Sequence, residues 1–281
     1  MNKYSVALCM LLSGLLMASC DLDFIGNDDE GGEPDAELSE VVIHLRDLYG
    51  QTNGDEWHVA TNWCSDKPLN EWHGIQTDDE GNVVSISLPD NNLTGDFHLD
   101  LNVFKSLSYI NVDDNTLESF ELWGESESLN SLSLSSCVTD RVSFEYIDDV
   151  TISDCDSLAS ISGRCVGLEV IDTDFRHDAH TPFGVEAETA VIRNCHMHSC
   201  GVSSDYLVFE ESSTYDTWYC NTRIRMDLID CYCSTICGGD FYEDTIIKLE
   251  NATLWQSNWD EESLVTLTCT ITGREWDSLF D

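Results

Sequence analysis

Residues 83–93 read VVSISLPDNNL, and the spacing of their apolar side chains decides the fold. Val83, Ile86 and Leu88 are followed three residues later by Asn91 and then by an apolar residue. The same spacing returns at 107–117, 129–137 and 147–155, with cysteine in the asparagine position of the last two. One such unit has too little apolar surface to fold alone, so successive units are expected to stack and bury one another.

Weaker copies continue the pattern beyond residue 160. We align them at 168–173, 190–195, 207–212, 226–231, 247–252 and 264–269. The copies recur about every twenty residues, and each supplies one short strand with its alternate apolar side chains turned inward. The sequence therefore predicts a solenoid of about ten short parallel strands over 80–273, with clear repeats to about residue 160.

The segment 37–79 is predicted to cover the first repeat, because a terminal repeat otherwise exposes its apolar edge. Pro34-Asp35 is expected to open a helix, and Gly50 to end it. Its apolar side is formed by Val41, Val42, Leu45, Leu48 and Tyr49. Trp57, Trp63 and Trp72 follow, and we expect helix and tryptophans together to form an N-terminal cap.

Several motifs within 45–95 match a known family. They are the Leu-x-x-Leu-Tyr helix end, Asn62-Trp63, Trp72-x-Gly74-Ile75 and Asn91-Asn92-Leu93-Thr94-Gly95. This stretch resembles the N-terminal cap and first repeat of receptor-type leucine-rich-repeat proteins and their bacterial relatives. The resemblance implies a right-handed solenoid, α/β or mainly β, whose concave face binds proteins or glycans. The second cap cysteine of the plant proteins has no counterpart near Gly74, so a disulfide from Cys64 is not implied.

The first twenty residues carry an export signal. Lys3 precedes the apolar run 6–17, which is shorter than the roughly twenty residues that span a bilayer. Met17-Ala18-Ser19-Cys20 then resembles a bacterial lipobox. We expect a signal peptide at 1–19, a lipid on Cys20 and an acidic flexible tether at 20–36, with a tail at 274–281. The acidic tether resembles the export signal of Bacteroidetes surface lipoproteins and implies the outer membrane, at the cell surface. The alternative is an ordinary signal peptide.

Composition limits the partners. Asp and Glu number 54 against 12 Lys and Arg, a formal net charge of −42. Such a surface repels nucleic acid and anionic headgroups, so membrane contact is expected through the Cys20 lipid only. Of 13 cysteines, removal of Cys9 with the signal and Cys20 as the lipid site leaves eleven. That number is odd, so at least one thiol stays unpaired unless chains are cross-linked.

Side chains between the buried positions are expected to face outward and to form the candidate binding face. The candidates are Tyr109, Asn111, Asp113, Asp149, Asp172, Asp174, Arg193, Tyr206, Arg225 and Lys248. The first six make a polar, hydrated surface, whereas the last four form a mixed-charge patch better suited to protein contact. The alternative is a solvated sheet without a ligand.

A cluster of soft and borderline ligands is the only cofactor signal. His177, His180, His196, His198 and Cys200 are expected on adjacent turns, where they would suit zinc. The spacing matches no established zinc motif, and exported cysteines more often form disulfides, so apart from this cluster no cofactor is expected.

Enzymatic motifs are missing from the sequence. It contains no Gly-x-Ser-x-Gly, phosphate loop or His-Glu-x-x-His, and adjacent carboxylates are common by chance among 54 acids. We therefore predict a lipid-anchored surface recognition protein, not an enzyme, that binds a protein or glycan. The alternative is a metal- or disulfide-stapled structural lipoprotein of the envelope, and a parallel β-helix enzyme acting on polysaccharide ranks third.

Overall fold

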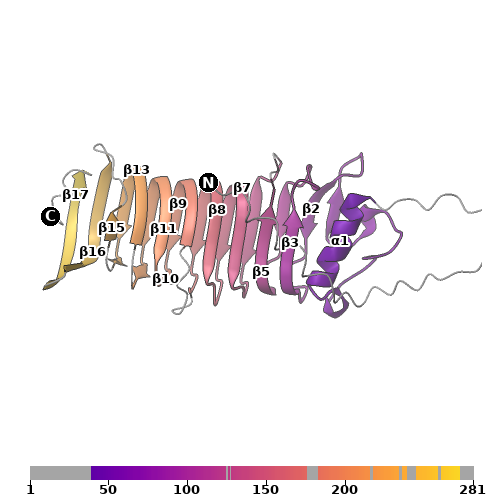
Figure 1. Ribbon diagram of the computed structural model, residues 1–281, viewed down its shortest axis with the longest axis horizontal. Helices are drawn as coiled ribbons and strands as arrows, with labels where there is room; N and C mark the ends of the chain where they lie inside the picture. The colour runs from indigo at the N-terminus through magenta and orange to yellow at the C-terminus, as the bar shows by residue number, and fades with distance from the viewer. Residues whose placement is uncertain are drawn as a thin grey trace, which may run out of the picture. The chain divides into compact units, whose positions relative to one another are not determined.

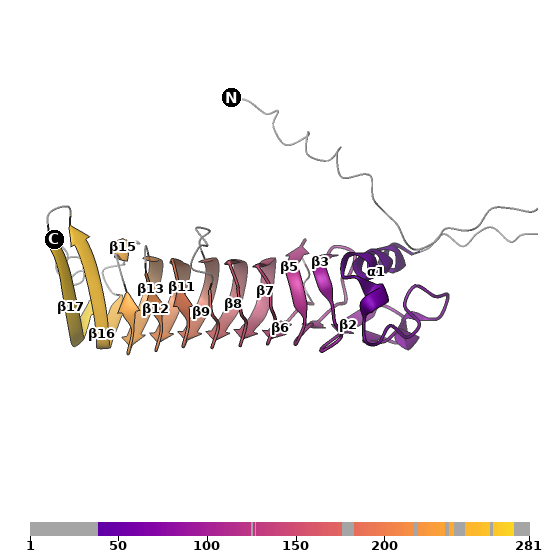
Figure 2. The ribbon, with the colours of Figure 1, turned by 90° about the horizontal axis from the view of Figure 1, so that it is seen from below.

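In the computed structural model the described residues are 39–272 without 125, 127, 176–182, 216–217, 234–235, 239–244 and 259–260. They form a mainly-β solenoid whose turns follow one another along a nearly straight line in both views (Figures 1 and 2). The prediction of a mainly-β solenoid of stacked parallel strands is confirmed. Cys20, the tether and the tail at 274–281 lie outside the described residues.

The secondary structure consists of one α-helix, two short 3₁₀ segments and seventeen strands among the described residues. Their bounds are α1 Glu40–Gln51, η1 Gly54–Glu56, η2 Leu69–Glu71, β1 Ile75–Thr77, β2 Val83–Ser87, β3 Thr94–Asp100, β4 Tyr109–Asn111, β5 Thr116–Trp123, β6 Ser131–Ser135, β7 Arg141–Ser153, β8 Ser160–Ile171, β9 Phe183–Arg193, β10 His196–Met197, β11 Cys200–Glu210, β12 Ser213–Thr214, β13 Trp218–Ile229, β14 Tyr232–Cys233, β15 Ile236–Gly238, β16 Ile246–Asn258 and β17 Glu261–Thr272.

Three parallel ladders run along the stack. The first joins β2, β4, β6, β7, β8, β9, β11, β13 and β16 in that order. The second joins β3, β5, β7, β8, β9, β11, β13 and β15. The third, short ladder joins β10, β12, β14 and β16. The long strands β7, β8, β9, β11 and β13 therefore begin in the second ladder, turn a corner and end in the first, whereas β16 begins in the first ladder and ends in the third. All of them are longer than the short strands that the sequence predicts.

Apolar side chains fill most inward positions, although Ser204 and Thr222 are also buried in the column that contains Ala187. The central column comprises Ile86, Ile110, Leu132, Val150, Leu168, Ala190, Leu207, Met226 and Ile247, all buried. Beneath the second ladder Phe97 stacks on Phe120 with ring centroids 4.8 Å apart. Each turn has an apolar edge that the following turn covers. The apolar side chains are therefore buried by the stacking of turns and not within any single turn.

A buried side chain follows the first ladder on every turn, and we call this column the turn ladder. It consists of Asn91, Asn115, Cys137, Cys155, Thr173, Cys195, Ser212, Cys231 and Ala252. Asn115 Oδ1 accepts the backbone N–H groups of Asn91 (3.2 Å) and Leu93 (2.9 Å) from the preceding turn. Ser212 Oγ accepts the N–H of Cys195 at 3.0 Å in the same way. The column thus satisfies amides that would otherwise be buried without an acceptor.

Cysteines continue the turn ladder where asparagine stops. The Cys137 thiol donates to the Val112 carbonyl at 3.3 Å, and the backbone amide of Asn115 is hydrogen-bonded to Cys137 in turn. Contact with Cys155 together with burial raises the pKa of Cys137. Burial raises the pKa of Cys195 to about 12. Both shifts disfavour the thiolate form of Cys137 and Cys195, whereas the contact with Cys137 lowers the pKa of Cys155.

The residue just before each turn-ladder position has a left-handed backbone. These residues are Asp90, Asp114, Ser136, Asp154, Asp172, Asn194, Glu211, Asp230 and Asn251, with φ between 47° and 57°. Aspartate and asparagine tolerate this conformation better than most residues, which explains why they recur there. The turn they make sends the chain from the first ladder to the third side of the solenoid.

The cap is built as a helix packed on a tryptophan cluster. α1 begins at Glu40, where Ser39 Oγ accepts the N–H of Val42, and it runs through Gly50 rather than ending there. Pro34-Asp35 lies outside the described residues. The Trp57 and Trp63 rings meet edge to face at 4.8 Å, and both are buried.

The cap is hydrogen-bonded directly to the first turn. Asn91 Oδ1 accepts the N–H of Val59 at 2.7 Å, and Asn91 Nδ2 donates to the Val59 carbonyl at 3.1 Å. Asn92 Nδ2 donates to the Glu56 carbonyl at 2.7 Å. The Asn-Asn pair of the first repeat therefore holds the cap in place.

Antiparallel strands close both ends of the described stack. β1 pairs antiparallel with β2, and β17 pairs antiparallel with β16. The prediction of a further parallel repeat at 264–269 is therefore wrong. β16 ends at Asn258 and β17 begins at Glu261, and a parallel strand needs a much longer connection than this spacing in the sequence allows.

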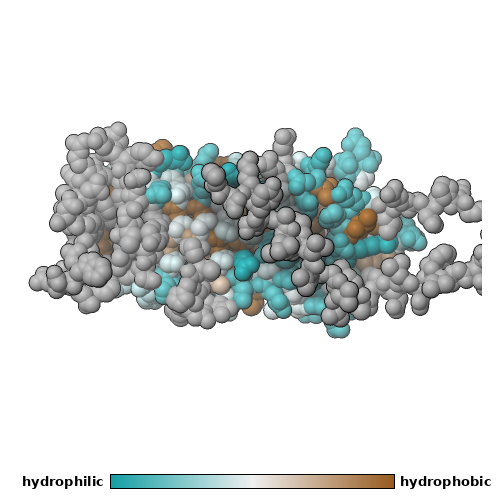
Figure 3. Space-filling view, in the orientation of Figure 1, coloured by the Kyte–Doolittle hydropathy of each residue, from teal (hydrophilic) through white to brown (hydrophobic). Residues whose placement is uncertain are grey.

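On the face seen in Figure 3, hydrophilic side chains predominate around α1, and white to brown surface is visible over the middle turns. Within the residues described, no helix has the length and apolar character that crossing a membrane requires.

Candidate binding face

The outward side chains of the first ladder form one continuous surface, which we call the ladder face. Its first column is Ser85, Tyr109, Ser131, Asp149, Gly167, Thr189, Tyr206, Arg225 and Ile246. Its second column is Ser87, Asn111, Ser133, Thr151, Glu169, Val191, Val208, Asp227 and Lys248. A third runs through Ser135, Ser153, Ile171, Arg193, Glu210, Ile229 and Glu250.

Most predicted site residues lie on this face. They are Tyr109, Asn111, Asp113, Asp149, Arg193, Tyr206, Arg225 and Lys248. Asp172 and Asp174 do not, and their assignment is wrong. Thr173 occupies the turn ladder, so Asp172 is the left-handed turn residue, and Asp174 pairs with His196 on the third side. The prediction aligned Ile171 as an inward residue, whereas Val170 is the buried one.

In the N-terminal half of the ladder face, the polar groups bind one another. Asn111 Nδ2 donates to Tyr109 Oη (3.1 Å) and to Asp113 Oδ2 (2.9 Å). Asp113 Oδ1 accepts the backbone N–H of Ser135 at 2.7 Å, and Ser135 Oγ lies 2.7 Å from Ser153 Oγ. Groups already paired in this way gain little from a ligand, because each new contact would replace an existing hydrogen bond.

The C-terminal half carries all the cations of the ladder face. Arg193 Nε lies 2.8 Å from Glu210 Oε2, and Lys248 Nζ lies 2.7 Å from Glu250 Oε2. The hydrogen bond to Glu210 raises the pKa of Arg193, and that to Glu250 raises the pKa of Lys248. These exposed pairs contribute little to stability, but they fix the direction of the side chains.

Arg225 has the best-defined geometry of the three. Its Nε and Nη2 donate to the two carboxylate oxygens of Asp227 at 2.7 and 3.0 Å. This fork raises the pKa of Arg225 and holds its planar guanidinium on the surface.

Arg225 stands between two large exposed side chains in the first column. Tyr206 is 46% exposed and Ile246 is 45% exposed, and each lies directly beside Arg225 on a neighbouring strand. Ile246 is not among the site residues that the sequence predicts. The strand register could have identified Ile246, because adjacent residues of a strand point to opposite sides. Ile247 is buried, so Ile246 faces outward.

The predicted zinc ligands are only partly described. His177 and His180 lie outside the described residues. His196 is exposed, with its Nδ1 2.8 Å from Ser213 Oγ, whereas Cys200 is buried in the interior. Within the described ranges, no group of three or more His, Cys, Asp or Glu side chains is placed to hold a metal ion.

Comparison with protein-family models, with curated proteins and with solved structures gives no match to this chain.

Proposed function

We propose that the chain is a lipid-anchored recognition protein of the bacterial cell surface, of the leucine-rich-repeat type, that binds a protein partner through the C-terminal half of the ladder face. The exposed column Tyr206, Arg225 and Ile246 carries the proposal. Tyrosine and arginine are enriched at the energetic centres of protein interfaces, and isoleucine supplies apolar area between them.

The surrounding charges support this assignment. Only 12 of 281 residues are basic, yet Arg193, Arg225 and Lys248 gather within the C-terminal half of one face. Each is paired with a carboxylate, so the patch is mixed in charge and has fixed directions. Such a pattern favours specificity for one partner over general attraction of cations.

The proposed lipid anchor agrees with a binding face that lies outside the membrane. The lipid on Cys20 attaches the chain to the membrane, and the formal net charge of −42 on the full chain disfavours contact between the protein and anionic headgroups.

The test is surface display followed by binding. Cells carrying the full chain are labelled with an antibody and exposed to candidate host or envelope proteins. The double variant Tyr206→Ala/Arg225→Ala is expected to bind at least about 500-fold more weakly, because each central interface residue costs about 2 kcal/mol or more when truncated and about 1.4 kcal/mol corresponds to a factor of about ten.

The matched control is Tyr232→Ala/Arg141→Ala, which removes an exposed tyrosine and an exposed arginine that are not on the ladder face. It is expected to bind like the unaltered chain. Equal binding by both double variants would place the contact elsewhere, and a chain inaccessible to antibody on intact cells would contradict surface display.

A further inference from the structure

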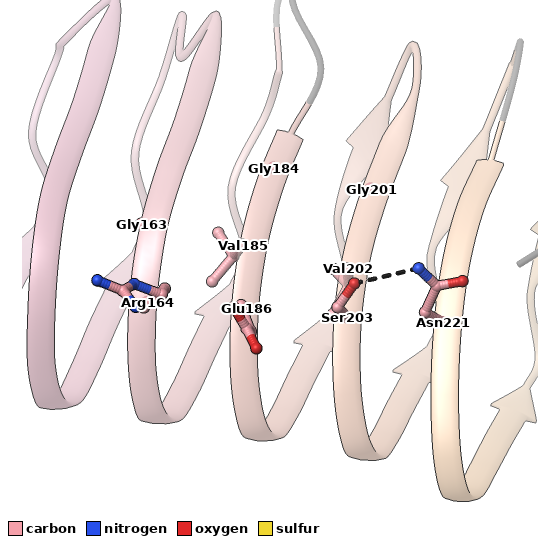
Figure 4. A pocket seen from close by; sticks show the side chains of 9 residues that line it. All are labelled: Gly163, Arg164, Gly184, Val185, Glu186, Gly201, Val202, Ser203 and Asn221. Atoms are coloured by element: carbon pink, nitrogen blue, oxygen red, sulfur yellow. Dashed lines mark hydrogen bonds between the residues drawn. The ribbon is translucent and has the colours of Figure 1, made fainter. Parts of the chain in front are cut away.

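A groove lies on another side of the solenoid, over the second ladder. It has a volume of about 420 Å³ and crosses β8, β9, β11 and β13 (Figure 4). Its polar border is formed by Arg164, Glu186, Ser203 and Asn221, which occupy one register position on successive strands. Figure 4 shows these four side chains in a row along the stack, just before each long strand turns its corner.

Glycine makes the floor of the groove. Gly184 and Gly201 pair with each other in the column next to the polar row, at outward positions of β9 and β11. The same column carries serine on the preceding strand, at Ser162. Glycine within a strand weakens it, and it often marks a bulge, a bend or a place where a ligand or another backbone approaches closely.

The polar row offers both donors and acceptors. Arg164 supplies guanidinium N–H groups, Glu186 supplies carboxylate oxygens, and Asn221 supplies both kinds of group. The one hydrogen bond drawn among these side chains runs from Asn221 Nδ2 to Ser203 Oγ at 3.4 Å (Figure 4). The row therefore suits a ligand rich in hydroxyl groups, which donate and accept at the same atom.

An aromatic side chain extends the row beyond the groove. Tyr146 pairs in register with Arg164 and is 44% exposed. Strands in a ladder lie about 4.8 Å apart, so the row from Tyr146 to Asn221 spans about 20 Å along the stack. A tyrosine ring at one end presents an apolar face on which the C–H face of a pyranose ring packs, and its hydroxyl remains hydrated.

Other ligand classes fit the groove less well. A peptide added as a strand needs a sheet edge, but β9 and β11 are paired on both sides. An apolar small molecule needs an enclosed apolar pocket, whereas this groove is open to solvent and has a polar border. A polyanion is repelled by the net charge of −42 and meets Glu186 beside the single cation of the border.

From these features we propose that the groove binds a neutral oligosaccharide chain lying along the solenoid axis, with its backbone over Gly184 and Gly201 and its hydroxyls bonded to the polar row. This site is separate from the ladder face and does not depend on the protein partner proposed for that face.

The test is titration calorimetry of the full chain with cellohexaose, maltohexaose, xylohexaose and mannohexaose, and with hexagalacturonate as the acidic counterpart. We expect at least one neutral hexasaccharide to bind and the acidic one not to bind. Gly184→Thr/Gly201→Thr fills the floor with side chains that strands tolerate, and binding should weaken about ten-fold or more. Arg164→Met should weaken binding about ten-fold, whereas Arg141→Met, an exposed arginine of the same ladder, should leave it unchanged.

Some outcomes support the groove proposal and others overturn it. Sugar binding that is weakened in Arg164→Met and retained in Arg141→Met supports the proposal, even if the double threonine variant does not fold. Absence of binding by all four neutral sugars, or binding of hexagalacturonate alone, overturns it. So does sugar binding that persists in Arg164→Met. Sugar binding that disappears in Tyr206→Ala/Arg225→Ala would place the sugar on the ladder face and also overturn the groove assignment.

Discussion

Replacing Asn115 with leucine tests whether the turn ladder stabilises the fold through hydrogen bonds. Asn115 Oδ1 accepts the amides of Asn91 and Leu93, both buried, and leucine removes this acceptor while filling similar space. Each buried donor left without an acceptor costs about 1–3 kcal/mol, so two of them lower the free energy of unfolding by about 2–6 kcal/mol. A domain is stable by only about 5–15 kcal/mol, so this loss is readily measured.

The assay is urea unfolding of the full chain, followed by tryptophan fluorescence and by circular dichroism. Trp57, Trp63 and Trp72 belong to the cap that covers the weakened turn, so fluorescence reports on it directly. The control is Asn102→Ala, because Asn102 is exposed and its side-chain amide donates to the nearby Asp100, so its loss should cost about 0.5 kcal/mol or less. If Asn115→Leu cost no more than the control, the buried amides would have other acceptors and the reasoning would be refuted.

Three further results are expected. Gly95→Ala should destabilise the chain by about 1–3 kcal/mol more than Gly81→Ala in urea unfolding. Both glycines have a φ of 86°, but only at Gly95 does the new Cβ meet a backbone oxygen, that of Gln51, at 2.5 Å. Equal losses in the two variants would argue against the clash. Burial raises the pKa of Cys195 from 9.0 to about 12, so its contribution to stability is present below pH 9 and is lost as the pH rises toward 12; Cys195→Ala should flatten the fall in urea midpoint over that range, and an unchanged slope would count against the assignment. Cys20→Ser should move the protein from the detergent phase to the aqueous phase in Triton X-114 partition, and continued detergent partition would rule out Cys20 as the lipid site.

The fold was predictable in the repeats where apolar residues and an asparagine or cysteine recur at the same spacing. The interval from Ile86 to Asn91 identifies both the inward strand positions and the turn ladder, because burial in a stack leaves few alternatives. Prediction failed at Thr173, where a threonine replaces asparagine or cysteine and Ile171 offers a second apolar residue. At 264–269 it failed because alternation specifies a strand but not its direction, which the length of the connection decides.

The candidate site was predictable only as a set of outward positions. The sequence placed Tyr206 and Arg225 outward because the buried residues around them alternate. It did not reveal that the polar groups near Asn111 bind one another, because those bonds join different turns. It also missed the groove, because Gly184 and Gly201 become neighbours only when the register of the second ladder is known.

The turn ladder gives the solenoid a direction of assembly. The amide of each ladder residue, from Asn91 through Asn115 to Cys195, is bonded by the side chain of the following turn and never by the preceding one. A chain that crosses a membrane amino end first would therefore complete each turn only when the next one arrives. Its growing end would always carry one open amide and one bare apolar edge, which makes the most recent turn the place where an incoming turn docks most readily.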